Sequence, residues 1–185
     1  MMLDDVRDHY RSLWGEPSRE AWFRMFGCEV EIYKWDADAN PKEVVIYASI
    51  GASAHPLNGF DPTHRVEFFT ELLPAEDRIA KPFSMLAMEP GLYGTGLERG
   101  HVLTHPEPLW PETPMHSFLI LGSSPNVLPS IEVSGDLHVE FLQTAPVFPS
   151  EVKFIREKGS EALMHLWNVE DVDFWNPYRL PNPPE

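Results

Sequence analysis

Two of the eight histidines have the spacing of zinc ligands. His101 and His105 are four residues apart, which on a helix would place both imidazoles on one face. Gly100, Val102 and Pro106 instead favour an extended chain around them. At about 3.3 Å per residue of extended chain, the two imidazoles would lie roughly 13 Å apart, too far to share one ion. This pair therefore predicts no metal site.

Other motifs of catalysis and cofactor binding also fail on spacing. The stretch 51–55, with Ser53 at its centre, lacks the second glycine of a nucleophile elbow and predicts a turn after a strand. Cys28 lies on the apolar side of a strand pattern, which indicates a buried thiol. Glu67 and Glu71 are too far apart along a strand to form an acid/base pair, and we expect them to be solvated. A glycine cluster misses the dinucleotide-binding spacing by one residue: Gly91, Gly94, Gly96 and Gly100.

We therefore expect a protein that is not an enzyme, with no catalytic, cofactor-binding or metal-ligating residue and no cofactor. One alternative stays open. His55, His64 and His116 could be brought together by the fold, and such a cluster would support a metal-dependent hydrolase.

The chain is strongly acidic. Its 185 residues include 14 basic and 29 acidic side chains, which gives a formal net charge of −15. Such a surface repels phosphate groups and anionic lipids, so direct binding of nucleic acid or a membrane is disfavoured. It suits a basic protein partner, because opposite charge accelerates association. The alternative that the acidity only keeps the protein soluble also stays open.

The compartment is predicted from what the sequence lacks. A single cysteine cannot close an internal disulfide, which argues against a secreted, disulfide-rich scaffold. The N-terminus has neither the basic start nor the apolar stretch of a signal peptide, and no apolar run reaches the roughly 18 residues of a membrane span. We expect the protein in the cytoplasm.

Helical spacing occurs mainly at the two ends of the chain. Val6, Tyr10 and Trp14 are spaced for a first helix that Gly15 ends. A second short helix is expected over 18–26, with Trp22, Met25 and Phe26 on one face. Three further helices are expected: between Pro82 and Pro90, from a Ser150 cap to Gly159, and from a Ser160 cap to Trp167 with Leu163 and Leu166 facing inward.

Strand patterns fill the middle of the chain. They cover residues 28–32, 44–50, 66–73, 101–104, 117–121 and 137–143. In the second of these, apolar residues point both ways, so Val45 and Tyr47 are both expected to be buried. This order predicts one α+β domain over 1–185, with a central, mainly antiparallel mixed sheet flanked by short helices. Prolines mark an extended loop at 106–114 and a C-terminal tail over 176–185.

Six segments carry a further signal. They are residues 45–53 with a Gly-x-Ser turn, 65–69, 86–87, 100–103, 141–147, and the stretch from Glu151 to Leu163. In this order they resemble the Suppressor of fused domain family, especially its shorter bacterial members. The resemblance spans about residues 40–167, which it implies is the core of the domain.

The resemblance implies a non-catalytic protein-binding module. The animal relative is regarded as a regulator that sequesters a transcription factor, with part of the contact made by an added peptide strand. Bacterial relatives are often encoded in polymorphic toxin loci and are regarded as immunity proteins. We therefore expect a protein that binds and masks a basic toxin or another protein partner, with its oligomeric state left open.

The partner-binding surface is expected on the loop 54–64 and the neighbouring segment 100–103. This loop leaves a buried strand, and functional contacts concentrate on loops that a rigid sheet positions. It combines aromatic and polar side chains, which suit recognition. The predicted contact residues are His55, Phe60, Asp61, His64 and His101.

Overall fold

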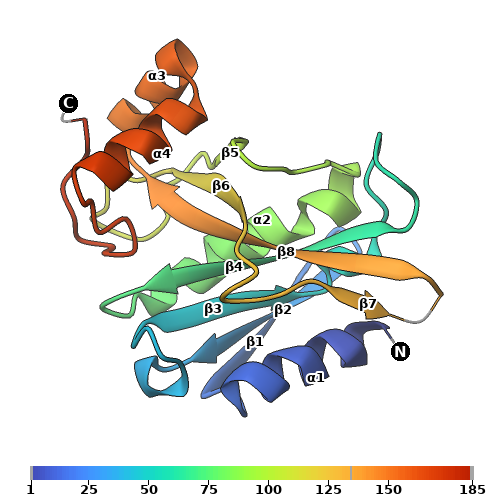
Figure 1. Cartoon of the computed structure of the whole chain (residues 1–185). Coiled ribbons are helices and arrows are strands. Elements are labelled where there is room, and N and C mark those ends of the chain that lie inside the picture. Colours follow the sequence, from blue (N-terminus) through green and yellow to red (C-terminus); the bar gives the residue numbers. More distant parts are fainter. Residues whose placement is uncertain (1, 134, 184–185) are drawn as a thin grey trace.

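The computed structural model describes residues 2–133 and 135–183, and within them one eight-stranded mixed sheet is flanked by four α-helices (Figure 1). The strands are β1 (Arg19–Met25), β2 (Cys28–Trp35), β3 (Val45–Ile50), β4 (His64–Leu72), β5 (Val102–Thr104), β6 (Ser117–Ser123), β7 (Ile131–Val133) and β8 (Leu137–Val147). The helices are α1 (Met2–Trp14), α2 (Ala80–Tyr93), α3 (Pro149–Lys158) and α4 (Ser160–Val169), with short 3-10 turns η1 (Ala37–Ala39), η2 (Ala52–Ala54) and η3 (Asp77–Ile79).

The strand order is β1-β2-β3-β4-β8-β6-β5, and β7 pairs with β8. Only the pairing of β4 with β8 is parallel in the described sheet; the other pairs are antiparallel. The predicted α+β class with a mainly antiparallel mixed sheet is therefore confirmed. The burial predicted for Val45 and Tyr47 is confirmed too, since both faces of β3 are covered.

Helices cover both faces of the sheet (Figure 1). On one face α1 packs Val6, Tyr10 and Trp14 against a cluster that includes Trp35 and Phe141. On the other face α2 packs against apolar side chains of β2, β3 and β4. The helices α3 and α4 form a third cluster with the ends of β6 and β8. None of the helices in the described residues combines the length and the apolarity needed to cross a bilayer.

The helix expected over 18–26 is wrong, because these residues form β1 and a hairpin turn. Met25 pairs with Cys28, and the two turn residues Phe26 and Gly27 both have positive φ, at 50° and 83°. A two-residue turn of this kind matches the twist of paired strands. Phe23 and Met25 of β1 then pack partly buried against the core on the α2 side, whereas Trp22 is exposed.

Three helix ends also differ from expectation. Ser160, expected to cap the last helix, is the first residue of α4, and its N-cap is Gly159. The helix expected to end before Pro90 continues to Tyr93, and Gly94 ends it in the left-handed conformation. Ser150 is not the cap of α3, because the helix begins one residue earlier, at Pro149. Instead the carboxylate of Glu151 accepts a 2.9 Å hydrogen bond from the backbone N–H of Phe148, the N-cap residue.

Candidate partner-binding surface

A buried carboxylate fixes the turn that follows β3. Oε1 of Glu67 accepts hydrogen bonds from the backbone N–H groups of Gly51 (2.8 Å) and Ser53 (3.0 Å) and from the Ser53 hydroxyl (2.6 Å). Oε2 accepts from the Ser49 hydroxyl at 2.6 Å. Burial raises the pKa of Glu67, while these four donors oppose the rise. The side chain therefore holds the start of the loop 54–64 against the sheet.

The expectation that Glu67 and Glu71 are solvated is wrong. Both are buried, because β4 lies inside the sheet and is covered on both faces. Glu71 binds Nζ of Lys42 through both oxygens at 3.0 Å and accepts from Nε2 of Gln143 at 3.1 Å. Both carboxylates thus satisfy structural donors rather than facing solvent.

The tip of the loop is a fixed polar turn. Oδ1 of Asp61 accepts hydrogen bonds from the backbone N–H (2.8 Å) and the hydroxyl (2.6 Å) of Thr63, which lowers the pKa of Asp61. Nη1 of Arg65 donates to the carbonyls of Pro62 (2.6 Å) and His64 (2.8 Å). Residues 61–63 are exposed and yet held in one shape.

The base of the loop packs into a trough made by three glycines in the last turn of α2 and just after it. A methyl group at these positions would lie within 2.1–2.7 Å of a loop side chain. The facing pairs are Gly91 with His55, Gly94 with Asn58, and Gly96 with Phe60. Three of the four glycines that fail as a dinucleotide motif therefore give room for the loop, whereas Gly100 faces Ser160. Sequence spacing alone could not show this, because the contacts join segments more than 30 residues apart.

Aromatic stacking links the loop to the start of β8. The rings of Phe60 and His64 stack with centroids 5.7 Å apart, and His64 stacks on His138 at 6.1 Å. Nε2 of His64 lies 3.7 Å from Oε2 of Glu140. The structure therefore brings Phe60, Asp61 and His64 together at one end of the β4–β8 pair.

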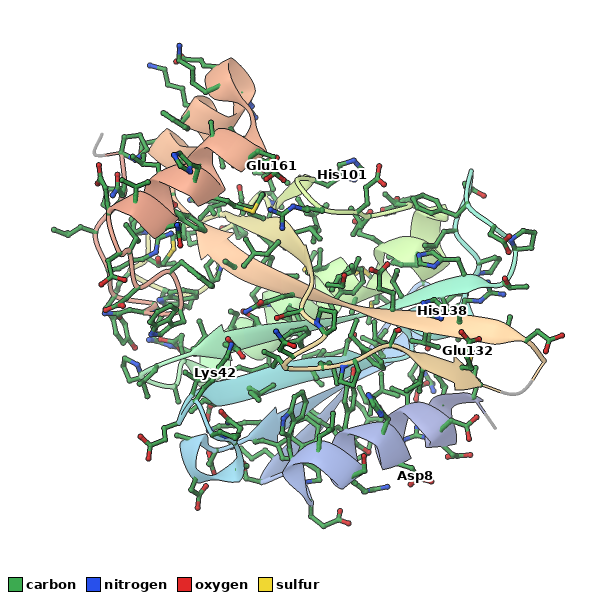
Figure 2. The ribbon with its side chains drawn as sticks, viewed as in Figure 1. Asp8, Lys42, His101, Glu132, His138 and Glu161 are labelled. Carbon is green, nitrogen blue, oxygen red and sulfur yellow. The ribbon has the colours of Figure 1, made fainter. Side chains whose placement is uncertain are left out.

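The other two predicted contact residues lie elsewhere. His55 sits at the base of the loop, with Nε2 3.9 Å from Sγ of Cys28. Nε2 of His101 lies 3.7 Å from Oε1 of Glu98, just before β5. Nδ1 of His138 lies 2.8 Å from Oε1 of Glu132 at the β7–β8 pair (Figure 2). The predicted set is thus one cluster with His55 beneath it and His101 at a separate place. That these five residues contact a partner stays a prediction.

The Cys28–His55 contact was not predicted from spacing. Burial raises the pKa of the Cys28 thiol, so this cysteine lacks the thiolate character of a nucleophile. Among the residues that the structure describes, no group of three or more His, Cys, Asp or Glu side chains could hold a metal ion. His116 lies near His105, away from the loop. The hydrolase alternative thus has no assembled ligand set in the described chain.

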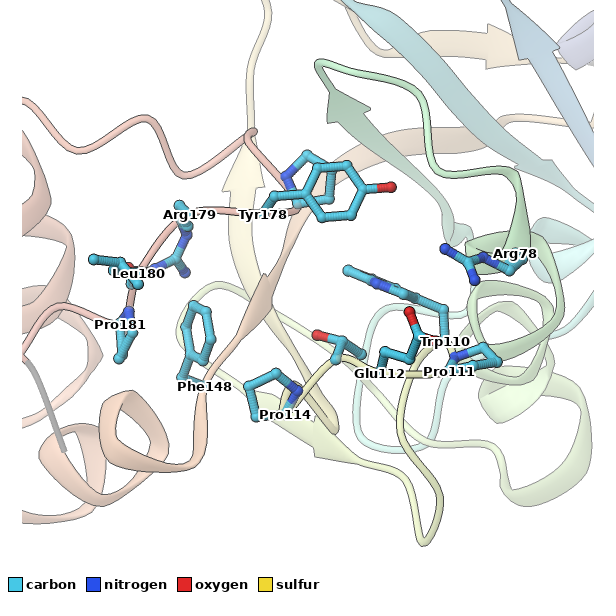
Figure 3. Close-up of a pocket in the computed structure, with 12 residues that line it drawn as sticks. Arg78, Trp110, Pro111, Glu112, Pro114, Phe148, Tyr178, Arg179, Leu180 and Pro181 are labelled. Atoms are coloured by element: carbon cyan, nitrogen blue, oxygen red, sulfur yellow. Dashed lines mark hydrogen bonds between the residues drawn. The ribbon is translucent and has the colours of Figure 1, made fainter.

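The expected extended tail folds back onto the domain and walls a groove. Arg179 forms a buried ion pair with Glu151, and its guanidinium stacks over the rings of Phe148 (4.9 Å) and Trp167 (5.0 Å). The last two residues of the predicted tail, 184–185, lie outside the described residues. The groove beside the tail has a volume of about 600 Å³. It lies between Arg78 and Trp110 on one side and Phe148 and the tail on the other (Figure 3).

Comparison with protein-family models shows which family the chain belongs to. The family model for the Suppressor of fused protein (SUFU) matches residues 28–180. The chain belongs to the Suppressor of fused family. The resemblance in the six sequence segments is therefore confirmed. No curated protein sequence matches the chain.

Solved Suppressor of fused structures share this fold. A Suppressor of fused homologue from Neisseria gonorrhoeae FA 1090 superposes with a TM-score of 0.71 at 16% identity, over 96% of this chain and 94% of its own. A chain of the Sufu–Fu complex gives 0.65 at 16% identity, over 90% and 83%. Drosophila Suppressor of Fused gives 0.66 at 15% identity over 97% of this chain, which spans 50% of the Drosophila protein.

Two of the six segments meet in this Suppressor of fused domain. The Gly-x-Ser turn of segment 45–53 supplies the N–H groups and hydroxyl that bind Glu67, and Glu67 belongs to segment 65–69. These two segments therefore act as one unit that holds the loop 54–64.

Proposed function

We propose that this Suppressor of fused domain is a non-catalytic module that binds and masks a protein partner. The observation that carries the proposal is the turn 61–63, which is exposed and yet fixed by Thr63 and Arg65. A loop that is already ordered loses little conformational entropy on binding, which favours recognition. A relative of the same fold is found in the Sufu–Fu complex, which supports a role in protein binding.

The proposed partner is a basic toxin, and the proposed role is that of an immunity protein in the cytoplasm. The net charge of −15 supports this partner, since it attracts a basic surface over several ångströms before contact. Asp61 contributes a carboxylate at the tip of the fixed turn, where it is exposed to an approaching cation.

The test is binding of the purified chain to the toxin domain encoded by the neighbouring gene. Asp61→Asn removes the charge but leaves an amide oxygen in place of the carboxylate oxygen Oδ1, and this oxygen can accept the same two hydrogen bonds from Thr63. Glu157→Gln, on the exposed surface of α3, removes one charge elsewhere and is the matched control. We expect Asp61→Asn to weaken binding about tenfold, or about 1.4 kcal/mol, and the control to bind like the wild type.

Equal affinities for the two variants would remove this turn from the interface. Absence of binding by the wild type would contradict the immunity role itself. Calorimetry at two salt concentrations completes the test, because attraction between a basic toxin and this acidic chain must weaken as salt increases.

A further inference from the structure

One edge of the sheet is long, regular and open. Among the described residues, the only strand beside β1 is β2, and the seven pairs between them run without a register shift. Soluble proteins usually protect such edges by short strands, bulges or prolines. The sequence of Arg19–Met25 contains no proline, and the opposite edge strand, β5, has only three residues. β1 therefore presents a row of backbone groups that another strand can pair with.

The exposed side chains of β1 are aromatic as well as charged. Trp22, at the middle of the strand, is 60% exposed, and Phe26 in the adjoining turn is 89% exposed. Trp22 is paired with Glu31, so it lies on the α1 face of the sheet together with Glu20 and Arg24. Phe23 and other alternate residues pack partly buried on the α2 face.

We propose that β1 pairs in an antiparallel manner with β1 of a second copy of this chain, about a two-fold axis midway between the two copies of Trp22. Side chains of directly opposed residues point to the same face of a sheet. A two-fold axis perpendicular to the sheet must therefore lie midway between the two copies of one residue, so that this residue opposes itself. Three axis positions near the middle of β1 can be compared.

The axis at Trp22 is the one that pairs opposite charges. It places Glu20 opposite Arg24 of the second copy, and Arg24 opposite the second Glu20. On the same face the two Trp22 rings meet at the axis. On the α2 face Ala21 lies opposite Phe23 of the second copy, so that a small side chain faces a large one. An axis at Ala21 puts Glu20 opposite Trp22, and an axis at Phe23 puts Trp22 opposite Arg24. The sequence Glu-Ala-Trp-Phe-Arg is thus self-complementary about its centre.

The charged groups are placed to make these contacts. The Arg24 side chain is 74% exposed, and its Nε donates to Oε2 of Glu29 at 2.8 Å. Glu20 forms no ion pair with the described residues of its own chain and is exposed. In the pair of copies, Arg24 would lie between Glu29 and the second Glu20. The net charges of −15 repel each other, but salt screens this repulsion beyond about 8 Å at physiological ionic strength and acts less on groups in contact.

Charge reversal tests the register. Glu20→Arg sets two arginines against each other at both pairs, and Arg24→Glu sets two glutamates against each other. We expect sedimentation velocity to show a dimer for the full-length wild type, and each variant to raise the dimer dissociation constant at least about tenfold. An equimolar mixture of the two variants should restore the dimer, because each Arg-bearing strand then opposes a Glu-bearing one. A variant that fails to fold would not restore the dimer in the mixture, so the mixture separates loss of pairing from loss of folding.

Three results would overturn the proposal. The wild type could stay monomeric up to a chain concentration of about 1 mM, which would mean that any dimer dissociation constant is larger than about 1 mM. Both variants could dimerise like the wild type, or their mixture could associate no better than either alone.

A cysteine at the axis gives an independent measurement. Directly opposed residues of antiparallel strands have Cα atoms about 4.5–5.5 Å apart, which is within the range that a disulfide spans, so Trp22→Cys should form a disulfide-linked dimer on mild oxidation. Glu20→Cys is the control, because the two copies of this position would be about 13 Å apart along the strands. The native Cys28 is buried and common to both variants. Equal cross-linking of the two variants, or none in either, would contradict an axis at Trp22.

Discussion

The guanidinium of Arg179 binds both carboxylate oxygens of Glu151, with N–O distances of 2.5 and 2.8 Å, and both side chains are buried. Glu151 also accepts from the N–H groups of Phe148, which starts α3, and of Asn182 in the tail. One carboxylate therefore joins the start of a helix to the tail that follows the last helix. Forked pairs of this kind are the stronger class of charged hydrogen bonds.

We expect Arg179→Ala to lower the free energy of unfolding by about 3–5 kcal/mol, because it leaves the Glu151 charge buried without its partner. Arg156→Ala, on the exposed surface of α3, removes the same kind of side chain and should change stability by less than about 0.5 kcal/mol. Urea unfolding of both variants measures the difference. Equal losses would mean that the tail contributes little to the fold.

Leu163 is more deeply buried than Leu166 on the inner face of α4. Leu163 is fully buried in the cluster formed with Leu119 and Val147, whereas Leu166 is half-buried. We expect Leu163→Ala to cost about 2–5 kcal/mol and Leu166→Ala to cost less, since less apolar surface is lost from the core. Denaturant unfolding distinguishes the two. A loss under about 0.5 kcal/mol at Leu163 would show that α4 is peripheral.

His105 makes stability depend on pH. Its Nε2 is buried without a hydrogen-bond partner in the described chain, and its ring packs edge-on to Phe118. Burial, and next the nearby His116, lower the pKa of His105 below its ordinary value. The unfolded chain therefore takes up the proton first, and stability is lost as the pH falls from the ordinary value of 6.5 through the lower pKa of the folded protein.

His105→Phe removes this titration and keeps an aromatic ring beside Phe118. Relative to the wild type, we expect the variant to gain stability as the pH falls from about 7 to about 5. Thermal or urea unfolding across this range measures the gain. If the two stability curves run parallel, the burial of a neutral imidazole is not the cause.

The sheet could be predicted from the sequence because its strands carry a local signal. β3 is apolar on both sides, which predicts an interior strand, and β4 alternates apolar residues with Glu67 and Glu71. Residues 137–143 of β8 also have a strand pattern. The pattern misled at β1, where Trp22, Met25 and Phe26 have helical spacing. There the pairing with β2, a contact between segments, overrides that spacing.

The candidate site was less predictable for the same reason. The composition of the loop 54–64 predicts a contact surface, but the groups that hold the loop, Glu67 and the glycines of the trough, act across 14 to 36 residues of sequence. The anchoring of the tail by Arg179 likewise depends on a carboxylate 28 residues away. Local patterns carry no information about such contacts.

The trough gives a way to disturb the loop without changing its residues. The methyl group of Gly96→Ala would lie 2.1 Å from Cε2 of Phe60, so the ring must move. The backbone of Gly96 is outside the left-handed region, which means that the ring and not the backbone causes the strain. We expect the variant to lose about 1–3 kcal/mol of stability, the usual cost of overpacking, and to bind the partner less tightly.

Phe60→Ala tests whether the Phe60 ring is the cause of the stability that Gly96→Ala loses. Once the ring is removed, the methyl group at position 96 has room, so Gly96→Ala should then cost less than about 0.5 kcal/mol. Urea unfolding of the wild type, the two single variants and the double variant measures the coupling. An equal cost in both backgrounds would show that Phe60 does not occupy the trough. A large coupling, together with loss of binding in both single variants, would tie partner recognition to the fixed shape of the loop.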